Sequence, residues 1–151
     1  MVTQYEFATL PLSGVLEVAM LDLKKVLRGK KYLVDFDNWH QPDPELGVCR
    51  VCLAGAVIAK TFKAQAKQAV QLNDFSDGER TRLAALDEVR RGEIKYAISM
   101  VNVNAGWSRI SHAIQDLPPS TFIRFDPYRM GYPTFFRRLK LIVKVLRLHG
   151  F

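Results

Sequence analysis

Residues 47–62 read GVCRVCLAGAVIAKTF, and this stretch decides how the rest of the chain can be arranged. Apart from Arg50 and Lys60 it is apolar on nearly every side, which predicts a helix at the centre of the core. Gly55 costs about 1 kcal/mol relative to alanine inside a helix. We therefore expect a packing reason for Gly55, namely the close approach of a neighbouring element.

Helical patterns lie on both sides of this stretch. Residues 11–29 carry apolar side chains every three or four positions, with Ser13 as the expected cap and Gly29 as the expected stop. A capping-box pattern at residues 76–79 begins a periodic run that Gly92 interrupts, so one helix or two can follow. A short helix is expected within residues 102–117.

The last expected helix runs from Pro133 to Leu148, because proline suits the first turn of a helix. Residues 32–36 are the only candidate strand, and residues 35–47 are expected to form a loop with two prolines. The sequence therefore predicts one domain over residues 1–151, mainly α with about five helices and a small β element, with α+β as the alternative.

Two cysteines, Cys49 and Cys52, are three positions apart. Near a helix start the dipole would favour a thiolate on Cys49, as nucleophilic chemistry requires. The pair would also supply half of a zinc site, completed by His40, His112 or His149. Because the βαβ pattern of thioredoxin-like domains and a His-x3-5-His spacing are missing, we interpret the pair as packed core cysteines and expect no metal or cofactor.

The net charge of +7 is concentrated near the end of the chain. Residues 1–75 carry nine Lys and Arg against eight Asp and Glu, whereas residues 127–151 carry six cations and no acid. This excess indicates an anionic partner. No apolar run approaches the roughly 18 to 20 residues of a membrane span, and the start of the chain lacks a signal-peptide pattern, so we expect a cytoplasmic protein.

Residues 135–148 predict a cationic amphipathic helix. Projected at about 100° per residue, a basic stripe lies opposite an apolar face. The stripe consists of Arg137, Lys140, Lys144 and Arg147, and the apolar face of Phe135, Leu139, Ile142, Val143 and Leu146. Three uses stay open: a solvated face on a helix docked to the core, contact with phosphates, and binding to an anionic membrane surface.

No catalytic motif is complete, because paired carboxylates, a Ser-His-Asp order and Gly-rich phosphate loops are not found. We therefore expect a binding protein rather than an enzyme. Trp39-His40 can stack on a base and donate to an anion, or can cover the core and satisfy a backbone carbonyl. The candidate ligand-binding residues are Trp39, His40, Arg50, Tyr128, Arg129, Arg137, Lys140 and Lys144.

The combination of Trp39-His40 with Cys49-Arg50-Val51-Cys52-Leu53-Ala54-Gly55-Ala56-Val57 resembles a family of small proteins of tailed bacteriophages and prophages. In that family a Trp-His loop precedes a Cys-x-Val-Cys-x-Ala-Gly-Ala-Val helix. Residues 83–92 and 132–150 are similar to it in outline. The resemblance transfers no catalytic residue and implies a phage accessory protein acting on host processes or defences.

These observations lead to one main hypothesis and two alternatives. The main hypothesis is a non-enzymatic phage protein for counter-defence or host takeover in the host bacterial cytoplasm. It would bind an anionic nucleotide signal or a host nucleic-acid-handling complex. The alternatives are sequence-independent DNA or RNA binding and a thiol enzyme using Cys49 with His40. Self-association into a homo-oligomer stays open.

Overall fold

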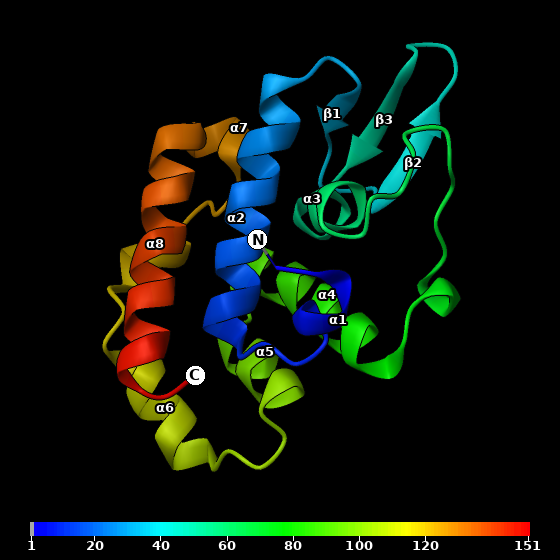
Figure 1. The fold of residues 1–151 in the computed structure, drawn as a ribbon. Coiled ribbons are helices and arrows are strands. Elements are labelled where there is room, and N and C mark those ends of the chain that lie inside the picture. Colours follow the sequence, from blue (N-terminus) through cyan, green and yellow to red (C-terminus); the bar gives the residue numbers. More distant parts are fainter. Residues whose placement is uncertain (1) are drawn as a thin grey trace.

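Eight α-helices and one three-stranded sheet form the part of the chain that the computed structural model describes, residues 2–151 (Figure 1). The helices are α1 (Gln4–Phe7), α2 (Leu12–Arg28), α3 (Leu53–Lys60), α4 (Asp77–Arg90), α5 (Ile94–Val101), α6 (Trp107–Gln115), α7 (Pro127–Met130) and α8 (Tyr132–Leu148). The strands are β1 (Tyr32–Val34), β2 (His40–Asp43) and β3 (Val48–Val51). The prediction of a mainly α fold with a small β element is confirmed.

The two long helices, α2 and α8, pack side by side and run in opposite directions (Figure 1). The expected helix over residues 11–29 is confirmed, and Gly29 ends it. The expected cap was wrong: Pro11 occupies the N-cap position, and Ser13 lies inside α2. The Ser13 amide donates to the Phe151 carbonyl at 3.0 Å, which ties the start of α2 to the end of the chain.

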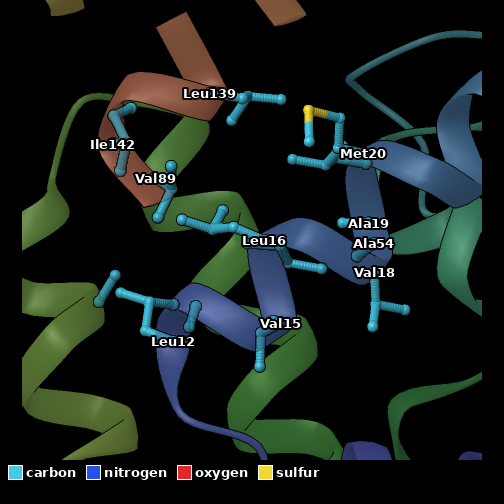
Figure 2. Close-up of a cluster of buried hydrophobic side chains, with 14 of the residues drawn as sticks. Leu12, Val15, Leu16, Val18, Ala19, Met20, Ala54, Val89, Leu139 and Ile142 are labelled. Carbon is cyan, nitrogen blue, oxygen red and sulfur yellow. The ribbon is translucent and has the colours of Figure 1, made fainter. Parts of the chain in front are cut away.

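The core is built around α2, which packs against α3, α4 and α8. Met20 of α2 points toward Leu139 of α8, while Leu16, Val89 and Ile142 fill the space beside them (Figure 2). The apolar face predicted for residues 135–148 is buried and its basic stripe is exposed. The amphipathic character of α8 is therefore explained first by docking on the core.

The sheet has the order β1-β3-β2, with β1 parallel and β2 antiparallel to β3. Cys49 lies opposite Tyr32 on one side and Pro42 on the other. The Cys49 amide donates to the Lys31 carbonyl at 2.8 Å, so the backbone of Cys49 points toward β1. Pro42 consequently turns its backbone nitrogen away from β3.

The predicted helix over residues 47–62 was wrong in its first third. Residues 48–51 form β3, and α3 begins only at Leu53, after Cys52. The predicted loop over residues 35–47 was also wrong in part, because residues 40–43 form β2. These strands form because segments distant in the sequence pair with one another. The local pattern of apolar residues contains no information about that pairing.

The close approach of a neighbouring element that we predicted at Gly55 is confirmed. A Cβ atom at this position would lie 1.5 Å from the Trp39 carbonyl oxygen and 2.9 Å from Cβ of Val51. The backbone before β2 therefore rests directly on α3. Glycine allows α3 to lie this close to the sheet.

The remaining expected helices are present. Ser76 and Glu79 form the capping box at the start of α4, and Gly92, with φ of +83°, separates α4 from α5. The interrupted periodic run is therefore two helices. The helix expected within residues 102–117 is α6, and the terminal helix begins one residue before Pro133. None of the helices in residues 2–151 has the length and apolar character needed to cross a membrane.

Candidate functional site

A cleft of about 880 Å³ opens beside the sheet, at the end where β1 and β3 begin. Four segments form it: the start of β1, the turn between β2 and β3 with its flanking residues, Ala59 near the end of α3, and the irregular residues 63–67 that follow α3. Its size lies within the range of roughly 300–1,000 Å³ typical of small-molecule sites. We call it the lysine cleft.

The charge of the lysine cleft is positive. Lys31, Lys63 and Lys67 line it, and Asp43 is the single acidic residue among the lining residues. The Asp43 carboxylate accepts from the Arg50 guanidinium at 3.1 Å. Hydrogen bonds from the Leu46 amide and from Arg50 lower the pKa of Asp43, so it stays ionised and paired. The lysine ammonium groups are thus the charges available to a ligand.

An apolar floor and one aromatic ring accompany these lysines. The floor comprises Pro42, Val48, Ala59, Ala64 and Ala66, and Tyr32 supplies the ring. The Lys60 ammonium lies 5.2 Å from the centroid of that ring, within the range of a cation–π interaction. A ligand in the cleft would therefore meet a cationic rim and an apolar, partly aromatic surface.

His40 does not line the cleft, but it connects two of the segments that form it. The ring is buried, and Nδ1 donates to the Gln68 carbonyl at 2.8 Å, since a carbonyl can only accept. This bond joins β2 to the segment that carries Lys63 and Lys67. Nε2 is then the acceptor nitrogen, buried and without a hydrogen-bond partner in residues 2–151. Burial lowers the pKa of His40, which keeps the ring neutral at pH 7.

Both cysteines are buried free thiols, as the packing interpretation predicts. Cys49 Sγ lies 3.6 Å from His40 Nδ1, yet burial raises the pKa of Cys49 to about 11. Cys52 accepts from the Gly55 amide at the start of α3, and burial raises its pKa to about 12. Neither sulfur is therefore a thiolate at neutral pH, and no thiolate–imidazolium pair forms between Cys49 and His40. No cluster of three or more potential metal ligands occurs in residues 2–151.

Besides His40, two further candidate ligand-binding residues beside the sheet, Arg50 and Trp39, make contacts within the fold. Arg50 divides its guanidinium between Asp35 and Asp43, each at 3.1 Å. Trp39 is half-buried; its carbonyl touches α3, and its side chain hydrogen-bonds to Asp87. Burial raises the pKa of Asp87, and the hydrogen bond from Trp39 offsets only part of that rise.

The other candidates lie elsewhere. Arg129, Arg137, Lys140 and Lys144 are exposed on α7 and α8. The Tyr128 hydroxyl donates to the Val34 carbonyl, and burial raises the pKa of that hydroxyl to about 12. In Figure 1, α2 lies between α8 and the sheet. The structure therefore divides the eight predicted residues between separate surfaces.

The cleft lysines were not predicted from the sequence, because acidic residues nearby in the sequence nearly cancel their charge in the total for residues 1–75. Residues 1–75 are nearly neutral overall, but Asp35 and Asp43 are both occupied by Arg50. One available signal was the alternation KAQAK at residues 63–67, in which small apolar residues separate lysines directly after a buried helix.

We expect His40 to make the fold sensitive to acid. Its folded pKa is lowered, so its stabilising contribution is complete above the unfolded value of about 6.5 and is lost as pH falls through the folded pKa. His40→Asn keeps a donor for Gln68 but cannot titrate. Between about pH 7.5 and pH 5, the free energy of unfolding in urea should therefore fall less for this variant than for the wild type.

The matched control is His112→Asn, which removes a histidine exposed on α6. It should keep the wild-type loss of stability on acidification. Equal losses for His40→Asn and the wild type would contradict the role given to His40.

Comparison with models of known protein families, with curated proteins and with solved structures finds no match to this chain. The resemblance to phage proteins therefore stays a prediction.

Proposed function

We propose that this chain is a non-enzymatic binding protein that captures a small anionic ligand of the nucleotide class in the lysine cleft. In the phage setting that the sequence resemblance implies, it would act in the host cytoplasm by sequestering a nucleotide signal used in defence. The carrying observation is the cleft of about 880 Å³ lined by three lysines, with its one acid already paired to Arg50.

The two sides of the cleft suit the two parts of a nucleotide. Lys31, Lys63 and Lys67 are point charges of the kind that bind phosphate oxygens. The Tyr32 ring and the apolar floor offer a surface on which a base can stack, and such stacking is worth about 1–3 kcal/mol per base.

The environment of the thiol supports a binding function over the thiol enzyme. Cys49 is fully buried and its pKa is raised to about 11. A nucleophilic cysteine needs a lowered pKa and access to substrate. The exposed stripe on α8 supports sequence-independent nucleic-acid binding as a second candidate function, because Arg137, Lys140 and Lys144 lie on one side of a helix that contains no acid.

Calorimetric titration with nucleoside triphosphates, cyclic dinucleotides and inorganic triphosphate at low salt tests the proposal. At least one nucleotide should bind saturably. Lys31→Glu/Lys67→Glu should weaken that binding by at least about tenfold, since it reverses two of the three ligand-facing charges. Lys140→Glu/Lys144→Glu is the matched control: it changes the net charge equally on α8 and should leave nucleotide binding intact.

Three results would count against the proposal. The first is an absence of binding by every probe at low salt. The second is equal weakening by both double variants, which would indicate binding to net charge alone. The third is loss of binding with the α8 variant only, together with affinity for a DNA or RNA duplex, which would favour the second candidate function.

A further inference from the structure

A second hollow, of about 600 Å³, lies between α2 and α8, and we call it the helix groove. Its floor is apolar and consists of Met20, Leu21, Val143 and Leu148. Leu21 is 51% exposed and Leu148 is 75% exposed, although both lie on helices whose other leucines mostly face the core. Two large apolar side chains are thus presented to solvent in one concave surface.

The rim of the helix groove is cationic. Lys140, Lys144 and Arg147 follow one another along α8 at spacings of four and three residues. Glu17 of α2 is the one acid among the lining residues, and it pairs with Arg147. Two ammonium groups one helical turn apart are left to face an incoming partner.

The shape and composition of the groove distinguish between classes of partner. A nucleic acid would use the cations but would leave the leucines of the floor uncovered. A membrane would need the apolar face of α8, yet Phe135, Leu139 and Ile142 are fully buried in the core. An amphipathic helix uses both features, because its apolar side chains cover the floor while its acids reach the rim.

The dimensions agree with a helix of modest length. The groove follows α8 from Lys140 to Leu148, which is about 12 Å at 1.5 Å per residue. That length matches roughly two turns of a partner helix and three apolar anchors at spacings of three or four residues. Acidic side chains one turn apart on that helix would lie opposite Lys140 and Lys144.

We propose that the helix groove is a docking site for an acidic amphipathic helix of a partner protein. The exposed ion pairs contribute little affinity individually and mainly speed and orient association, whereas covering Leu21 and Leu148 supplies most of the affinity. Because this site shares no residue with the lysine cleft, the proposal goes beyond nucleotide binding and can fail or succeed separately from it.

Fluorescence anisotropy with a labelled 16-residue synthetic helix tests this docking. The probe carries leucines on one face and glutamates on the others, and a scrambled peptide of equal composition spreads the leucines around the helix. The wild-type protein should bind the first probe saturably and the second at least about tenfold more weakly. Leu148→Glu and Leu21→Glu should each reduce binding about tenfold or more, whereas Leu72→Glu, an exposed leucine outside the groove, should not.

The contribution of the rim charges to peptide binding is tested with the same two double variants that serve in the nucleotide titration. Lys140→Glu/Lys144→Glu should weaken the peptide severalfold and flatten its salt dependence, while Lys31→Glu/Lys67→Glu should leave peptide binding unchanged. Thermal melts establish that each variant is folded, and the two separate leucine variants keep the test decisive if one is unstable. Equal binding of the scrambled peptide, insensitivity to both leucine variants, or displacement of the peptide by a DNA duplex at equal charge concentration would overturn the proposal.

Discussion

Gly55→Ala is expected to destabilise the fold by more than about 3 kcal/mol, because the added Cβ meets backbone rather than a flexible side chain. The new atom would lie 1.5 Å from the Trp39 carbonyl oxygen and 2.7 Å from its carbon, whereas ordinary contacts begin near 3.4 Å. Helix α3 would have to retreat from the sheet by about 2 Å, and the fully buried residues that surround it would lose their packing.

Urea unfolding followed by circular dichroism measures this loss. Gly29→Ala is the control: Gly29 has φ of −94°, and its added Cβ would lie 3.8 Å from the nearest atom, the Val26 carbonyl oxygen. That variant should stay within about 1 kcal/mol of the wild type. A Gly55→Ala protein with wild-type stability would show that α3 and the backbone before β2 are not in direct contact.

Phe135→Ala should cost about 3–5 kcal/mol, a large part of the roughly 5–15 kcal/mol that stabilises a domain of this size. Phe135 is fully buried, and its ring centroid lies 5.0 Å from that of Phe125 and 5.9 Å from those of Phe36 and Phe136. Removing the ring opens a cavity between α8, the end of β1 and the loop before α7.

The midpoint of urea unfolding, at constant slope, reports this cost. Phe135→Leu should lose less, because it leaves a smaller cavity. Tyr5→Ala removes an aromatic ring that is 85% exposed and should change the free energy of unfolding by no more than about 0.5 kcal/mol. Similar losses for Phe135→Ala and Tyr5→Ala would contradict the place given to Phe135 in the core.

The helices that could be predicted are those whose own residues show the periodicity of a helix, without reference to any other part of the chain. In α2 and α8 the apolar residues recur with the period of a helix, and the apolar face predicted for α8 is the one that is buried. Strand β3 could not be predicted in this way, because VCRV is followed at once by a buried helix and its partners are residues 32–34 and 40–43. Only pairing across the chain separates the strand from the helix.

The same reason limits what the sequence says about the site. Arg50 looks like a free cation in the sequence, but it pairs with Asp35 and Asp43, which lie 15 and seven positions earlier. The lysine cleft forms only when β1, the turn after β2 and residues 63–67 come together. The stripe on α8 was predictable, by contrast, because one helix carries all of it.

Pro42 has a consequence for how this protein behaves at high concentration. It lies on β2, an outer strand of the sheet, and its ring nitrogen faces away from β3, where another chain would otherwise find an amide donor. Proline at such an edge interrupts the ladder that strand addition requires. The sheet is thereby protected at this edge against growth by stacking of further copies, the step that begins β-aggregation.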